Sequence, residues 1–206
     1  HTVQVFVQGV GGTLPAAPGS FNYNVPNVSV ATSELGGGFG PTTGGIAITL
    51  MGSNFGHAQG PEISLAGTRC GVPVWTSDSS LTCRLPAGVG GRVPVDVVVA
   101  GRKGSSDKVF SYQAPEAVKV TPDESFQCRG CELEVTGNHF GLQIDQLKVS
   151  VDGHDCIVTA LTSRRFLCLL SFGDGKKALR VQVGNQVSLT APTSSFTGIP
   201  STLRFI

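Results

Sequence analysis

The sequence repeats itself along the chain, and this internal repeat restricts the possible folds more than any other feature. Residues 44–56, GGIAITLMGSNFG, match residues 131–141, CELEVTGNHFG. Residues 63–70, ISLAGTRC, match residues 149–156, VSVDGHDC, in the same order. A unit that occurs twice in one order is expected to fold twice, so the sequence predicts two copies of one domain.

A second segment occurs three times and sets the boundaries of the copies. Each occurrence has a valine-rich run, a loop, an aromatic residue and then a proline, which is Pro26, Pro115 or Pro200. These prolines define units of roughly 85–90 residues, within the usual size range of one domain. The predicted division is a terminal hairpin of a preceding repeat at 1–25, a first domain at 26–113, a second domain at 114–199 and the first strand of a following repeat at 200–206.

Alternating apolar residues predict that both domains are built from β-strands. Val93, Val95 and Val97 share one face of an extended segment, and residues 46–50 and 179–183 alternate in the same way. This period of two is typical of half-buried antiparallel strands. The 28 glycines and 12 prolines do not suit a mostly helical protein. With about seven short strands expected in each unit, the sequence predicts an all-β fold of tandem sandwiches.

The first copy resembles an IPT/TIG domain, the immunoglobulin-like domain of plexins and related receptors, of fibrocystin-like surface proteins, and of some transcription factors and amylolytic enzymes. The resemblance rests on GGIAITLMGSNFG at 44–56, GTRC at 67–70, SLTCRLPAG at 80–88, VDVVVAG at 95–101 and FSY at 110–112. It covers nearly the whole chain, although the second copy has LLSFGDG at 169–175 in place of the PAG turn. The resemblance implies tandem immunoglobulin-like sandwiches and no single activity, because this fold is a scaffold.

Four of the six cysteines form a repeated pair. Cys70 and Cys83 in the first copy match Cys156 and Cys168 in the second copy. Repetition of a spaced pair predicts one disulfide in each domain.

The remaining pair, Cys128 and Cys131, occurs only in the second copy and has three interpretations. A structural bridge before a strand is favoured. A redox pair would need a helix that the pattern lacks, and a zinc site would need two further ligands at suitable spacing. Three bridges indicate an oxidising, extracellular setting or the cell surface.

Both ends of the chain resemble parts of further repeats. An isolated hairpin is marginal in water and an exposed apolar edge invites pairing, so these pieces are expected to need a covering partner. The sequence predicts joints with other copies of this chain in a homopolymer, or with adjacent repeats of the same chain. A lone two-domain protein whose hairpin folds back on its first domain is the remaining possibility. The predicted joint residues are Val3, Val5, Phe6, Val7, Phe21, Tyr23, Leu203 and Phe205.

One segment matches the acceptor pattern for N-glycosylation. Asn27, Val28 and Ser29 form the only Asn-x-Ser/Thr sequence in the chain. In a secreted eukaryotic protein, Asn27 is a candidate for a covalently attached glycan.

Residues that carry catalysis or ligand chemistry are scattered. The sequence lacks a Gly-x-Ser-x-Gly turn and a Walker loop, and its four histidines and few carboxylates form no spaced cluster. We therefore predict that the chain is not an enzyme and has no catalytic residues, metal site or cofactor. A net charge of +1 with isolated basic pairs argues against a nucleic-acid partner. No apolar run approaches the ~20 residues of a membrane span.

These observations favour a structural subunit or repeating segment of an extracellular filament or surface stalk, joined end to end by strand complementation or tandem repeats. The alternative is the ligand-binding ectodomain of an adhesion or receptor-type surface protein. A third class, an accessory domain of a carbohydrate-active enzyme, would need paired exposed aromatic residues. Trp75 is the one tryptophan, and its counterpart Leu161 favours packing over sugar stacking.

Overall fold

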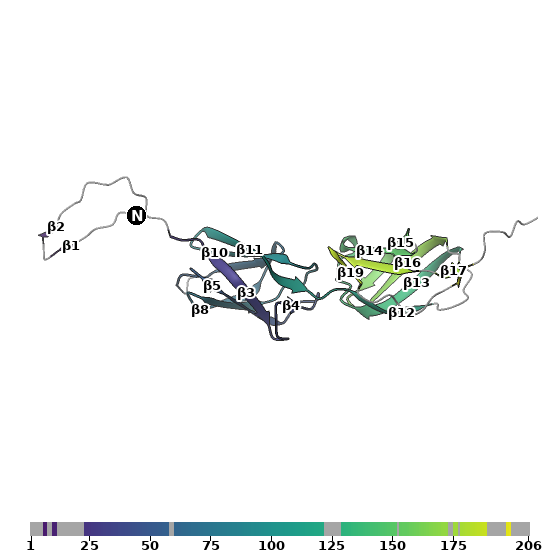
Figure 1. Ribbon diagram of the computed structural model, residues 1–206, viewed down its shortest axis with the longest axis horizontal. Coiled ribbons are helices and arrows are strands. Elements are labelled where there is room, and N and C mark those ends of the chain that lie inside the picture. Colours follow the sequence, from purple (N-terminus) through teal and green to yellow (C-terminus); the bar gives the residue numbers. More distant parts are fainter. Residues whose placement is uncertain are drawn as a thin grey trace, which may run out of the picture.

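A computed structural model of the chain contains two β-sandwiches that lie end to end along the long axis (Figure 1). The structure describes residues 6–7, 10–11, 23–57, 60–121, 129–151, 153–172, 175–176, 178–188 and 197–198. Within these ranges the one helix is a single turn, η1 (Ile144–Gln146), and the other elements are strands. The prediction of an all-β fold with tandem immunoglobulin-like sandwiches is confirmed.

The first domain packs a four-stranded sheet against a five-stranded sheet. The order of the four-stranded sheet is β3 (Asn27–Ser33), β5 (Ala47–Ser53), β9 (Ser80–Arg84) and β8 (Gly71–Ser77). The order of the five-stranded sheet is β4 (Phe39–Gly40), β11 (Arg102–Tyr112), β10 (Val93–Val99), β6 (Glu62–Leu65) and β7 (Thr68–Arg69). Neighbouring strands are antiparallel, except that β4 and β11 are parallel.

The core of the first domain follows from the alternation in the sequence. Ile48 and Leu50 on β5 are fully buried, and their cross-strand partners on β9, Cys83 and Leu81, are buried beside them. The opposite sheet contributes Ile63, Leu65, Val95, Val97 and Phe110. Removing these apolar side chains from water is the main favourable term in folding the sandwich.

The second domain repeats this arrangement within one continuous sheet. Its order is β12 (Glu116–Thr121), β13 (Arg129–Asn138), β16 (Arg165–Phe172), β15 (His154–Thr162), β14 (Leu147–Val151), β18 (Leu179–Val183) and β19 (Gln186–Val187). The start of β15 pairs with β14 and the rest pairs with β16, so this one strand belongs to both faces of the sandwich. In the core, the rings of Phe140 and Phe166 meet edge to face with centroids 4.9 Å apart.

Two further short strand pairs lie outside the main sheets. β1 (Phe6–Val7) pairs with β2 (Val10–Gly11), and β17 (Gly175–Lys176) pairs with β20 (Thr197–Gly198). Of the predicted joint residues, Phe6 and Val7 therefore lie in a strand, whereas Tyr23 is exposed and precedes β3. The others, Val3, Val5, Phe21, Leu203 and Phe205, lie outside the described residues. The end-to-end joints stay a prediction.

A glycine at the same position in both domains allows two strands to approach closely. A Cβ on Gly52 of β5 would overlap the carbonyl oxygen of Asn27 on β3. A Cβ on Gly137 of β13 would overlap the carbonyl oxygen of Glu116 on β12 in the same way. The repeat therefore needs a glycine here because no side-chain atom fits between the strands.

Candidate functional site: the interdomain junction

The connection between the two domains is short. Residues 113–115 alone separate β11 from β12. Gln113 donates its backbone N–H to the carbonyl of Gly40 at 2.8 Å, and Pro115 is buried. Neighbouring domains usually move relative to each other unless further contacts hold them, so the contacts beyond the linker decide how rigid this pair is.

Asn185 joins the second domain to the backbone of the first. It lies in the turn between β18 and β19. Its Oδ1 accepts the N–H of Gly91 at 2.7 Å, and its Nδ2 donates to the carbonyl of Gly91 at 3.0 Å. The side-chain amide of Asn185 thus bonds both the N–H and the carbonyl of Gly91. Because one of its atoms must accept and the other must donate, these two bonds fix the orientation of the amide.

Two more contacts connect the domains. Together with Asn185 and Gly91, the residues that make them form the interdomain junction, which is defined here as Val89, Gly91, Tyr112, Asn185 and Gln186. Gln186 donates from Nε2 to the carbonyl of Tyr112 at 2.9 Å. Val89, from the first domain, packs against the hydrophobic core of the second. The junction therefore combines an apolar contact with three directed hydrogen bonds.

Glycines make room for Val89. A Cβ on Gly141 would lie 2.9 Å from Cγ1 of Val89, and a Cβ on Gly184 would lie 3.2 Å from its Cγ2. Both distances are shorter than ordinary van der Waals contact between carbon atoms. Larger residues at these positions would push the two domains apart.

The equivalent hairpin of the first domain carries different side chains. Register places Ala100-Gly101-Arg102 where the second domain has Gly184-Asn185-Gln186. The first domain thus lacks both side-chain amides at these positions. The amide contacts are a property of the face that the second domain presents to the first, and not of the repeat in general.

Replacing Asn185 with Ala should loosen the junction without unfolding either domain. The substitution removes both hydrogen bonds to Gly91, whereas the side chain of Asn185 is exposed and outside both cores. We expect each domain to keep its unfolding free energy within about 0.5 kcal/mol. Nitrogen-15 relaxation should show the two domains tumbling more independently. Gln143→Ala, at an exposed amide that makes no cap hydrogen bond, is the control and should leave the tumbling unchanged.

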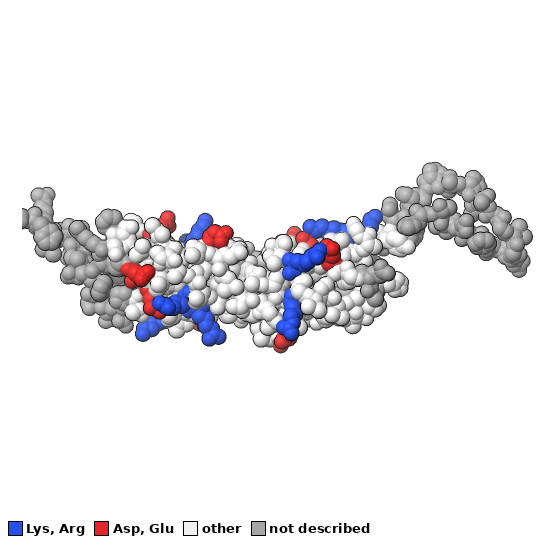
Figure 2. Space-filling model, turned by 180° about the vertical axis from the view of Figure 1, so that it is seen from behind, with Lys and Arg blue, Asp and Glu red and all other residues white. Residues whose placement is uncertain are grey.

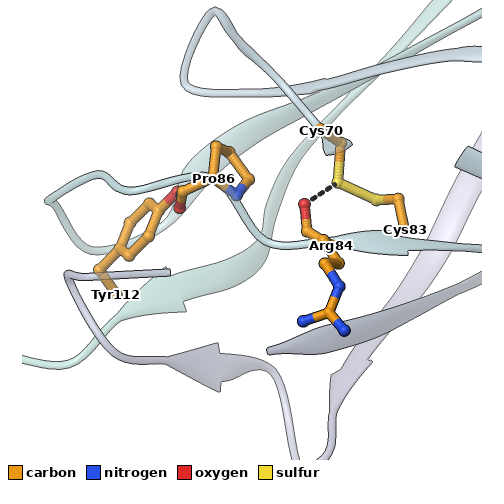
Figure 3. Close-up of a disulfide and its surroundings, with 5 residues drawn as sticks. All are labelled: Cys70, Cys83, Arg84, Pro86 and Tyr112. Atoms are coloured by element: carbon orange, nitrogen blue, oxygen red, sulfur yellow. Dashed lines mark hydrogen bonds between the residues drawn. A yellow bond between two sulfur atoms is a disulfide. The ribbon is translucent and has the colours of Figure 1, made fainter. Parts of the chain in front are cut away.

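Each domain contains one of the predicted disulfides. Cys70 and Cys83 are bonded with their Cα atoms 5.9 Å apart, and Cys156 and Cys168 with theirs 5.5 Å apart. All four cysteines are buried. Sγ of Cys70 lies 3.1 Å from the carbonyl oxygen of Arg84 (Figure 3). A bonded sulfur carries no hydrogen, so this is a close polar contact and not a donated hydrogen bond.

The other residues singled out from the sequence lie in different places. Cys131 lies on β13 opposite Leu170 of β16, but Cys128 lies outside the described residues, so their bridge stays a prediction. Trp75 donates its indole N–H to the carbonyl of Gly56 at 3.1 Å and packs against the core of the first domain. Packing, and not an exposed sugar platform, is therefore the role of Trp75. Asn27 is exposed at the start of β3.

The side chain of Tyr112 packs into the core of the first domain, next to the contacts with the second domain. Its ring is buried against Phe110, and its hydroxyl donates to the carbonyl of Pro86 at 3.0 Å (Figure 3). Burial disfavours the ionised phenolate and raises the pKa of Tyr112 to about 12. The backbone carbonyl of the same residue accepts the hydrogen bond from Gln186, so Tyr112 links the core of the first domain to the second domain.

Tyr112→Phe should reduce the unfolding free energy of the first domain by about 1 kcal/mol, the typical contribution of one hydrogen bond. The raised pKa means that the folded state favours the neutral phenol. Stability from this group is therefore complete below the usual tyrosine pKa and is lost as the pH rises toward about 12. Urea unfolding at neutral and alkaline pH measures both effects. In the variant, the part of the alkaline loss that Tyr112 causes should disappear.

Charged side chains of both signs are spread over the described surface (Figure 2), and six of them form three ion pairs. Figure 2 shows Lys and Arg beside Asp and Glu on both domains, with uncharged surface in the centre of the view where the domains meet. The three ion pairs are Arg69 with Glu62 at 2.8 Å, Lys103 with Asp96 at 3.0 Å and Arg165 with Glu134 at 2.6 Å. In the part of the chain that the structure describes, no three His, Cys, Asp or Glu side chains are grouped to hold a metal ion.

Comparison with known protein families agrees with this geometry. A model of the IPT/TIG domain matches residues 38–112 and, a second time, residues 115–197. The chain belongs to the IPT/TIG family. The two matched segments are separated only by the short linker, so the junction described above is a contact between two IPT/TIG domains.

The similar proteins match part of this chain, and the matched part is a small share of their own length. Plexin-B3 of Homo sapiens is 27% identical over 186 residues, which cover 77% of this chain and 10% of Plexin-B3. Plexin-2 of Caenorhabditis elegans is 31% identical over 103 residues, which cover 48% of this chain and 6% of Plexin-2. The chain thus spans a tenth or less of the length of these relatives.

A solved structure supports the fold of the IPT/TIG pair. The surface glycan-binding protein PbSGBP-B from Prevotella bryantii has a TM-score of 0.53 at 15% identity, over 84% of this chain and 42% of that chain. At this identity the likeness extends to the fold alone.

The location of this IPT/TIG pair follows from its relatives and its cysteines. The plexin relatives and the two disulfides place the chain outside the cell or at its surface. Among the described residues, none of the helical structure has the length and apolar character to cross a membrane.

The sequence did not indicate the residues that form the junction. It directed attention to the two ends of the chain, whereas the described contacts lie between the domains. The difference between Gly184-Asn185-Gln186 and its first-domain counterpart was the available signal. When the same turn carries two side-chain amides in one copy and none in the other, the amides indicate a contact that only the first of these copies makes.

Proposed function

We propose that this chain is a non-catalytic segment of the ectodomain of a receptor-type surface protein, in which the two IPT/TIG domains act as one unit that presents a ligand-binding surface at a fixed spacing. The junction carries this proposal. An ectodomain that positions a ligand needs neighbouring domains that do not swing freely, and Asn185, Gln186 and Val89 supply directed contacts between them.

The relatives favour the receptor alternative over the filament. Plexin-B3 and Plexin-2 support a place in a receptor-type surface protein. Neither of these two names indicates an end-to-end polymer. The proposal therefore rests on contacts within one chain.

Sedimentation velocity combined with negative-stain electron microscopy tests this role. The proposal expects one elongated monomer whose sedimentation coefficient does not change across the micromolar concentration range. Filaments with a regular axial repeat, or oligomers that grow with concentration, would contradict it. Val7→Asp, in strand β1, is the matched variant: it should change nothing under this proposal and should abolish oligomers if apolar end strands drive assembly.

A further inference from the structure

The four-stranded sheet of the first domain has an outward face on which two neighbouring rows of cross-strand partners contain no charged side chain. One row contains Val30, Met51 and Ser80, and the other contains Thr49, Thr82 and Val74. The uncharged face is defined as Val30, Thr49, Met51, Val74, Ser80 and Thr82, which cross-strand pairing places side by side. Val30, Met51 and Val74 are 47%, 50% and 49% exposed. A group of exposed apolar side chains on a sheet is expected to contact something in the mature protein.

The glycosylation sequence lies at the edge of this face. Asn27 is exposed and pairs with Ser53, which lies two residues from Met51 on the outward side of β5. Two residues along a strand span about 7 Å. The hydroxyl of Ser29 donates to the carbonyl of Met51 at 3.1 Å, so both polar residues of the acceptor sequence adjoin the strand that carries Met51.

The second domain provides an internal comparison. Its register places Glu116 at the position of Asn27 and Val118 at the position of Ser29, so it has no acceptor sequence. The face beside Glu116 is charged, because Lys119, Glu134 and Arg165 take the positions of Val30, Thr49 and Ser80.

On this face of the second domain, Arg165 and Glu134 form an ion pair at 2.6 Å. Charged side chains there are well solvated, and they also oppose edge or face association with another chain. In these two rows of the sheet, the copy without an acceptor asparagine therefore carries charged side chains and the copy with the acceptor asparagine has none.

We propose that an N-linked oligosaccharide attached to Asn27 lies over the uncharged face and covers Val30 and Met51. The first sugar is joined when Nδ2 of Asn27 loses a proton and bonds to the anomeric carbon of an oligosaccharide carried on a lipid diphosphate. The lipid diphosphate leaves with the bonding electron pair, and nothing is oxidised or reduced.

The geometry suits a neutral sugar. The carbonyl of Asn27 lies against Gly52, so the backbone at the attachment point is held close to β5. The C–H faces of pyranose rings can cover the exposed methyl groups of Val30 and Met51, while sugar hydroxyls can reach the hydroxyls of Thr49 and Ser80. Burial of apolar surface under the sugar is favourable without any charge on either partner. The inference rests on the extracellular location and not on the receptor role.

Met51 offers a direct probe because it is the single methionine of the chain. The 206-residue chain is secreted from a eukaryotic cell line with methyl-13C methionine, and its one methionine signal is recorded before and after a peptide N-glycosidase removes the oligosaccharide. We expect glycopeptide mass spectrometry to find Asn27 occupied. Nuclear Overhauser contacts between the Met51 methyl group and sugar protons should be lost on removal, with a shift of the methyl signal.

The inference would be overturned by an unoccupied Asn27, by an occupied Asn27 whose glycan can be removed without changing the Met51 signal, or by a Met51 signal of the glycosylated chain that broadens with concentration. The last would indicate a second copy of the chain on this face.

E116N combined with V118S is the matched control, because it places the same oligosaccharide on the charged face of the second domain. An endoglycosidase should trim that glycan faster than the one on Asn27. Equal rates would also contradict the inference.

Discussion

Removing the disulfide of the first domain should destabilise that domain by about 3 kcal/mol, the chain-entropy estimate for a loop of this size. Cys70→Ala combined with Cys83→Ala opens a loop with a sequence separation of 13 and replaces two buried sulfur atoms. Alanine avoids leaving an unpaired buried thiol. For a domain of this size, the loss corresponds to a fall of roughly 12–24 °C in Tm.

Differential scanning calorimetry together with hydrogen exchange can separate the two domains in this experiment. The first domain should melt earlier while the amides of the second keep their protection. Cys156→Ala with Cys168→Ala is the matched variant, and it should give the reverse pattern. If either pair of substitutions lowered both transitions equally, the two domains would unfold as a single cooperative unit, contrary to the separate hydrophobic cores of the two domains.

Gly137→Ala should reduce the unfolding free energy of the second domain by about 3 kcal/mol, at the upper end of the usual cost of overpacking. A methyl group there would overlap the carbonyl oxygen of Glu116 on the adjacent strand and would lie 2.7 Å from the ring of Phe140. Backbone cannot move aside as a flexible side chain can, so β12 would have to shift away from β13.

Urea unfolding followed by hydrogen exchange measures this effect. Gly71→Ala is the control, because a Cβ at Gly71 would meet only Arg84, with the nearest atom at 3.5 Å. That variant should stay within about 1 kcal/mol of the parent chain. Equal stability of the two variants would show that the strands at Gly137 separate without cost, and it would refute the role given to this repeated glycine.

Sequence patterns predicted the fold because the features that determine it are local or repeated. Alternating residues such as Ile48 and Leu50 identify a strand and its buried face within a few positions. Cys70 and Cys83 are 13 positions apart, their counterparts Cys156 and Cys168 are 12 apart, and both pairs are bonded in the structure. Each of these inferences needed only a short window or a comparison of two windows.

The junction could not be predicted in the same way. Gly91 and Asn185 are 94 positions apart, and neither belongs to an alternating pattern. Asn185 occupies a turn, where asparagine is common for local reasons, so its residue type alone gives no indication of a contact with another domain. Only the relative placement of the two domains brings its amide to the backbone of Gly91.

Residual dipolar couplings of the unmodified chain test the central claim, a fixed arrangement of the two domains, most directly. Amide couplings are measured in one alignment medium and fitted to residues 23–57 and 60–112 for the first domain, and to residues 116–121, 129–151, 153–172 and 178–188 for the second. The junction predicts that both sets fit one alignment tensor with the same magnitude and orientation. Two tensors of clearly different magnitude would show that the domains reorient independently and would contradict the account.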